Sequence, residues 1–153
     1  MFLLHLHKNP PASFGAIARQ LLKQICSMSE RVDFVCDRHI ATIKDLERNR
    51  RGSSDASFKI TGPEQTRPKD WEKALQLDSF KTAFLRFLLS EWQNDQYAEV
   101  ISGHVVYAAA EDHCLKFTSE RGQTICEEMP NYKVEHVEAD TRIIYHLMQI
   151  LEE

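Results

Sequence analysis

The amino-acid sequence predicts an α/β fold in which helices flank a central, mainly parallel sheet. Apolar side chains recur at helical spacing through residues 14–28, behind an N-cap at Ser13, and predict an amphipathic helix. The β-branched and aromatic run 32–36 then predicts a short buried strand, and the apolar segment 2–7 predicts a weaker strand before the helix. Strand, helix and strand in this order are typical of a parallel βαβ unit.

The middle of the chain predicts a helical layer followed by more strands. Aromatic and apolar side chains at helical spacing predict helices over 70–75 and 78–93, which we expect to cover the sheet. The run 104–109 predicts another strand, and the short runs 115–118 and 124–126 predict a hairpin. These elements are expected to join the βαβ unit in one domain.

Composition places the chain among soluble, single-domain proteins. It has 153 residues, of which 42% are hydrophobic, and a net charge of -4, which argues against a surface that binds nucleic acid everywhere. The four cysteines form no C-x-x-C pair, so no zinc module is predicted and we expect reduced thiols. The opening residues resemble neither a secretory signal nor a membrane span. We therefore expect an intracellular protein of the nucleus or cytoplasm, without a membrane partner.

Two predicted strands end in carboxylates. Asp37 closes the strand that follows the first long helix, while Glu138 and Asp140 follow the alternating run 132–137 and begin a helix predicted over 138–148. Ligands of open α/β sheets collect at the carboxyl ends of parallel strands, and Mg²⁺ prefers carboxylate oxygens. The alternative is that Asp37 caps a turn and that the two later acids complement a helix dipole.

Positive charge is concentrated just after Asp37. Residues 38–51 hold five Lys or Arg and two acids, so this segment carries +3 and the remainder carries -7. Lys44, Arg48 and Arg51 share one face of a helix and could hold a phosphate backbone, although a solvated helix face is the alternative. The Gly-, Ser- and Pro-rich stretch through residue 68 predicts an exposed loop.

These residues resemble a known family in their order and offsets. The strand ending in Asp37, with Lys44 and Arg51 after it, is similar to the flap-endonuclease and Asteroid-like branch of PIN-like nucleases. Glu138-Ala139-Asp140 resembles the later acidic pair of that branch. The longer string Glu138-Ala139-Asp140-Thr141-Arg142, together with Arg48, Arg51 and Gly52, also resembles uncharacterised animal proteins, often associated with mobile elements, that carry a PIN-like core.

The resemblance implies a PIN-like three-layer domain over 1–153, with 38–68 as a basic arch-like helix and flexible loop. It implies a nuclease that uses Mg²⁺ or Mn²⁺ to cleave DNA or RNA. Asp37, Glu138 and Asp140 would hold the metal, Lys44 and Arg51 would act at the scissile phosphate, and the nucleic-acid contacts would come from Lys44, Arg48, Arg50 and Arg51.

Two departures from the family pattern limit the expected activity. Residues 1–12 contain no Asp or Glu where the family has an acidic strand, and the sequence stops at Glu153, before the family's Asp-x-Asp strand. We therefore expect a copy truncated at both ends or degenerate, with weak metal binding and feeble catalysis. The alternative is a non-catalytic module on the same fold that binds nucleic acid or protein.

Overall fold

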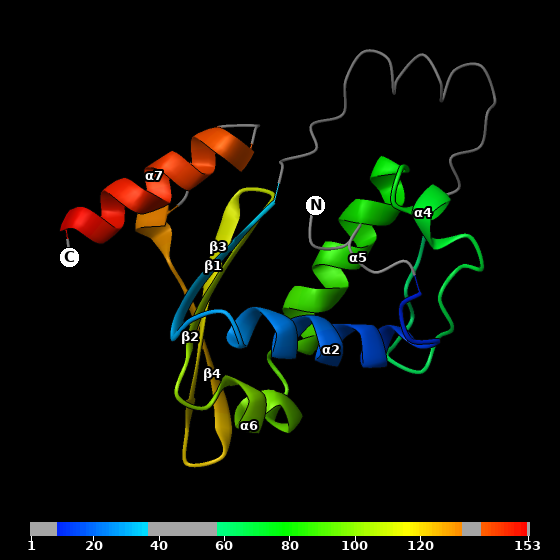
Figure 1. Cartoon of the computed structure of the whole chain (residues 1–153), viewed down its shortest axis with the longest axis horizontal. Coiled ribbons are helices and arrows are strands. Elements are labelled where there is room, and N and C mark those ends of the chain that lie inside the picture. Colours follow the sequence, from blue (N-terminus) through cyan, green and yellow to red (C-terminus); the bar gives the residue numbers. More distant parts are fainter. Residues whose placement is uncertain (1–8, 37–57, 133–138, 153) are drawn as a thin grey trace.

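The computed structural model describes residues 9–36, 58–132 and 139–152, and Figure 1 shows its arrangement. The helices are α2 (Phe14–Cys26), α4 (Trp71–Ala74), α5 (Asp78–Glu91), α6 (Ala98–Ile101) and α7 (Ala139–Glu152). The strands are β1 (Arg31–Val35), β2 (Val105–Ala110), β3 (His113–Glu120) and β4 (Gln123–Glu128). Two short 3-10 helices, η1 (Asp95–Tyr97) and η2 (Pro130–Tyr132), complete the set.

The long elements predicted from the sequence are confirmed. Helix α2 begins after Ser13, whose side chain caps the helix by accepting a hydrogen bond from the Ala16 amide. Helix α5, strand β1 and the hairpin of β3 and β4 also form where their patterns indicate. The predicted strand 2–7 and the basic segment 38–51 lie outside the described residues. Residues 58–68 contain no helix or strand, as expected for the loop.

The sheet is mostly antiparallel, which corrects the prediction of a mainly parallel sheet. Its described strands run in the order β1-β2-β3-β4, and only β1 and β2 are parallel, with Arg31 opposite Val105. The pairs β2–β3 and β3–β4 are antiparallel. Turns of two residues separate these strands, and such short connections permit only antiparallel pairing. The coarser prediction of a mixed α/β fold is confirmed.

One face of the sheet carries the main core. Helices α2, α5 and α6 cover this face (Figure 1), and their apolar side chains pack against Phe34 of β1 and Phe117 of β3. Trp92 follows α5, is fully buried, and donates a hydrogen bond from its indole nitrogen to the Ala18 carbonyl at 3.1 Å. This bond satisfies the indole nitrogen, which is the only polar atom of the buried Trp92 side chain.

The opposite face of the sheet is covered by α7 and η2. Because successive side chains of a strand point to opposite faces of the sheet, Tyr107, Ala109 and Cys114 lie on this face. They pack there against Tyr132 of η2. The rings of Tyr107 and Tyr132 are stacked with their centroids 5.2 Å apart. Helix α7 lies across this smaller cluster, on the other side of the sheet from α2 (Figure 1).

Candidate functional site

Most of the site residues predicted from the sequence lie outside the described residues. These are the metal ligands Asp37 and Glu138 and the basic side chains Lys44, Arg48, Arg50 and Arg51. Asp140 is described: it is exposed in the first turn of α7 and makes no ion pair within the described part of the chain. Its carboxylate is therefore accessible to a cation from solvent.

The first turn of α7 meets the carboxyl end of β1. Arg142 is almost fully buried, with 1% exposure, and its guanidinium donates a hydrogen bond of 2.8 Å to the Cys36 carbonyl. The Cys36 amide in turn donates to the Ala109 carbonyl at 2.9 Å, which continues the ladder to β2. Cys36, the residue before Asp37, is thus hydrogen-bonded to Arg142, which stands two residues after Asp140.

A buried pair between Asp33 and His146 fastens the middle of α7 to β1. The Nδ1 atom of His146 lies 2.8 Å from a carboxylate oxygen of Asp33, and His146 is 2% exposed. Nδ1 must carry a proton in this contact, because an ionised carboxylate only accepts hydrogen bonds. The other ring nitrogen, Nε2, is buried without a hydrogen-bond partner among the residues described.

Charged neighbours hold Asp33 in its ionised form. Burial raises the pKa of its carboxyl group, but hydrogen bonds from His146 and Arg31, with their charges, outweigh burial and hold the pKa below its usual value. The Arg31 Nε atom lies 3.1 Å from the carboxylate. The result is a carboxylate with partners on two sides.

Arg31 links this pair to the aromatic side chains of the same face. Its guanidinium donates to the Tyr132 hydroxyl at 3.0 Å and lies 4.3 Å from the centroid of the Tyr107 ring. The Tyr132 ring also contacts the His146 ring edge to face, with centroids 4.8 Å apart. We call Arg31, Asp33, Tyr132, Arg142 and His146 the α7 anchor, because they join α7 to the sheet through polar contacts.

Cys114 lies beside the anchor but is unsuited to nucleophilic chemistry. Burial, together with the charge of Asp33, raises the pKa of its thiol to about 12. A thiol with so high a pKa stays protonated at neutral pH and is a weak nucleophile. All four cysteines are free of disulfides.

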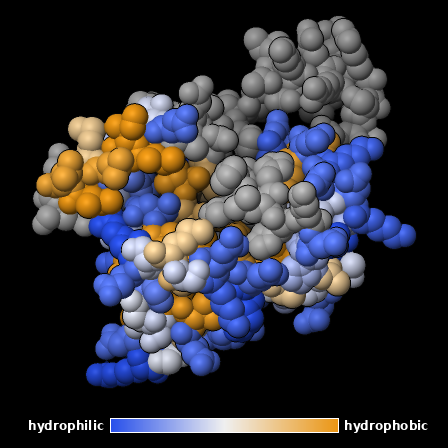
Figure 2. Space-filling view, in the orientation of Figure 1, coloured by the Kyte–Doolittle hydropathy of each residue, from blue (hydrophilic) through white to orange (hydrophobic). Residues whose placement is uncertain are grey.

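Helix α7 turns its apolar stripe away from the sheet. Arg142 and His146 face inward, whereas large apolar side chains one and two positions further along are exposed. Figure 2 shows this apolar surface along α7. The exposed side chains are Ile143 (44%), Ile144 (59%), Leu147 (54%), Met148 (54%) and Leu151 (87%). A contiguous apolar patch of this kind is typical of an interaction surface.

Sequence reasoning did not identify the α7 anchor. Asp33 sits within an apolar strand, and Arg142 and His146 are four residues apart, on one face of the last helix. The signal available in the sequence was Asp33 itself: a carboxylate in a strand predicted to be buried requires a partner, and Arg142 and His146 are a basic pair that could supply one. The carboxylates predicted as metal ligands, Asp37 and Asp140, are close to these residues in the sequence but are not part of the anchor.

Comparisons with known proteins leave the family assignment open. No family model, curated protein or solved structure matches the chain. Among the described residues, no group of three or more His, Cys, Asp or Glu side chains is placed to hold a metal ion. No helix in the described ranges is long and apolar enough to span a membrane.

Proposed function

We propose that the chain is a PIN-like, Mg²⁺-dependent nuclease-like domain with feeble catalytic activity. Its site would lie where the carboxyl end of β1 meets the first turn of α7. The observation that carries this proposal is the hydrogen bond from Arg142 to the Cys36 carbonyl. The bond joins Cys36, which directly precedes Asp37 in the sequence, to the helix that carries Asp140.

The donor chemistry of these segments fits a hard divalent cation. Asp37, Glu138 and Asp140 offer carboxylate oxygens, and the exposed Asp140 has no competing ion pair within the described residues. When bound, Mg²⁺ would stabilise negative charge on a phosphodiester during hydrolysis. Lys44 and Arg51 would orient the phosphate, with Arg48 and Arg50 extending the contact along the strand.

The expected catalysis is weak because three carboxylates provide few ligands. Two-metal phosphodiesterases clamp both the attacking and the leaving oxygen, which requires more acidic side chains than Asp37, Glu138 and Asp140 supply. A single, largely hydrated ion would be held loosely. We therefore propose nucleic-acid phosphodiesters as the substrate class, and we expect slow turnover.

A cleavage assay tests this assignment. The full chain is incubated with flap and single-stranded DNA and RNA in Mg²⁺ or Mn²⁺, alongside Asp37→Ala and Glu138→Ala. We expect slow, metal-dependent cleavage that both substitutions abolish, because each removes a third of the candidate ligands. Cleavage that persists in both variants, or a complete lack of cleavage, would contradict the proposed site.

The outward face of α7 favours a second candidate function, self-association. Ile144, Leu147, Met148 and Leu151 follow the spacing i, i+3, i+4 and i+7, which is the stripe through which two helices pack. The same stripe on a second copy is complementary under two-fold symmetry, the commonest symmetry of protein dimers. A single helix pair buries less area than a stable interface requires, so we propose a weak dimer.

A further inference from the structure

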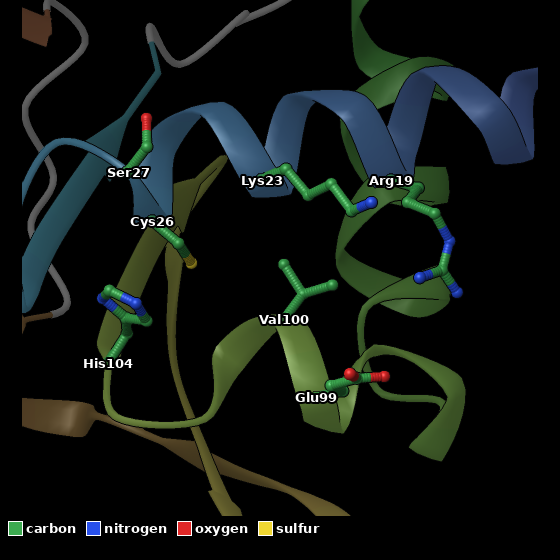
Figure 3. Close-up of a pocket in the computed structure, with 7 residues that line it drawn as sticks. All are labelled: Arg19, Lys23, Cys26, Ser27, Glu99, Val100 and His104. Atoms are coloured by element: carbon green, nitrogen blue, oxygen red, sulfur yellow. The ribbon is translucent and has the colours of Figure 1, made fainter.

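A pocket with two cationic side chains lies at the amino end of β1. Cys36 follows the other, carboxyl end of this strand. Helices α2 and α6 form its walls around a cavity of about 540 Å³ (Figure 3). His104, at one end of the pocket, directly precedes β2, and its Nδ1 atom lies 3.0 Å from the Ser29 carbonyl. Since β1 and β2 are parallel, the pocket borders their amino ends, away from the proposed metal site.

Arg19 and Lys23 place their charges along one wall of this pocket. They are four residues apart on α2, so they share a helix face, and both line the cavity (Figure 3). Arg19 is held in place, because it donates to the Gln96 carbonyl at 3.0 Å and lies 5.1 Å from the centroid of the Tyr97 ring. These contacts preorganise a guanidinium that retains further donors.

The positive charge of this wall is not neutralised by an ion pair. Glu99 of α6 is the only carboxylate that lines the pocket, and among the described residues neither it nor Lys23 forms a salt bridge. Like charges four residues apart on a helix repel each other, which raises the free energy of the empty pocket. An anion between Arg19 and Lys23 would relieve this repulsion.

We propose that this pocket binds the phosphate group of a nucleotide or of a nucleic-acid strand. The Arg19 fork and the Lys23 ammonium supply charge-assisted hydrogen bonds of the kind that recognise phosphate oxygens. Val100 and Cys26 provide an apolar wall against which a sugar can pack. The site is independent of the proposed nuclease function, since it uses other residues and requires no metal.

Two substitutions that neutralise opposite charges in this pocket test the proposal. Titration calorimetry in the presence of a chelator would use inorganic phosphate, adenosine 5′-monophosphate and a short single-stranded DNA as probes. Lys23→Gln should weaken binding of the nucleotide about tenfold, because it removes one charged donor. Glu99→Gln should strengthen binding about threefold, because it removes the repelling carboxylate. Both side chains are exposed, so neither change should disturb folding.

Matched controls are Lys73→Gln and Glu72→Gln, which alter the same residue types on the exposed surface of α4. They should leave the affinities unchanged. Equal affinity for phosphate and nucleotide would identify the phosphate group alone as the ligand, whereas tighter, Lys23-dependent binding of DNA would identify a strand. Absence of binding by all three probes, or binding that Lys23→Gln and Glu99→Gln do not change, would overturn the proposal.

Discussion

Replacing Asp33 by Asn is expected to lower the free energy of unfolding by about 2–3 kcal/mol at neutral pH. The substitution keeps the shape of the side chain but removes the negative charge that pairs with His146 and Arg31. An asparagine has only one acceptor oxygen, so it can accept from His146 or from Arg31 but not from both, and the bond that remains is no longer charge-assisted. We place the effect below the usual range for a fully buried pair because the Asp33 side chain is 20% exposed.

The pH dependence of this effect has a definite sign. Because the pKa of Asp33 in the folded protein lies below the ordinary value of 3.8, the pair contributes stability that is present above that value. The contribution is lost as the pH falls below 3.8 toward the lower pKa of the folded state. The difference in stability between the native chain and Asp33→Asn should therefore shrink in acid.

Urea denaturation over a range of pH values measures both expectations. Asp78→Asn is the matched control, since Asp78 pairs with Lys81 at 2.9 Å on the surface and its side chain is 55% exposed. This control should cost less than about 0.5 kcal/mol, as surface pairs do. The importance of the α7 anchor would be refuted if Asp33→Asn were no more destabilising than Asp78→Asn.

The second large expected effect concerns association through α7. Replacing Leu147 by Lys should abolish concentration-dependent dimerisation, because it places a charge at the centre of the exposed apolar stripe. Sedimentation velocity over a range of protein concentrations should show the native chain moving toward a dimer while Leu147→Lys remains a monomer. Leu147 is 54% exposed, so the substitution should not disturb the fold.

Leu77→Lys provides the control for this experiment. Leu77 is a comparably exposed leucine, at 45%, but it stands before α5 rather than on α7. Its replacement should leave dimerisation intact. A native chain that stays monomeric at all concentrations, or a dimer that both variants retain, would show that the outward face of α7 does not mediate self-association.

Local patterns predicted the helices well because their apolar faces are buried as expected. Phe14, Leu21 and Leu22 of α2, like Phe80 and Phe84 of α5, repeat at helical spacing and are almost completely buried. The direction of the strands was harder to predict. The turn between β2 and β3 contains Glu111 at φ 53°, a conformation that glycine or asparagine usually adopts, so it carried no recognisable hairpin signal.

The orientation of α7 could not be deduced from its amphipathic pattern. An apolar stripe normally faces the core, yet here Arg142 and His146 are buried while Leu147 and Met148 are exposed. The buried side chains gain a carbonyl and a carboxylate as partners, Cys36 and Asp33, which lie far away in the sequence. Such long-range polar pairing is invisible to a periodicity argument. Of the candidate metal ligands, only Asp140 is described.

Mn²⁺ binding to the full chain, followed by electron paramagnetic resonance, tests most directly whether Asp37 and Asp140 share one cation. We expect the native chain to bind one ion weakly, and Asp37→Asn and Asp140→Asn each to weaken binding by at least about tenfold. Asp78→Asn is the control, because Asp78 also lies in the first turn of a helix. Unchanged Mn²⁺ affinity in Asp140→Asn, or an equal loss in Asp78→Asn, would contradict a shared site at the junction of β1 and α7.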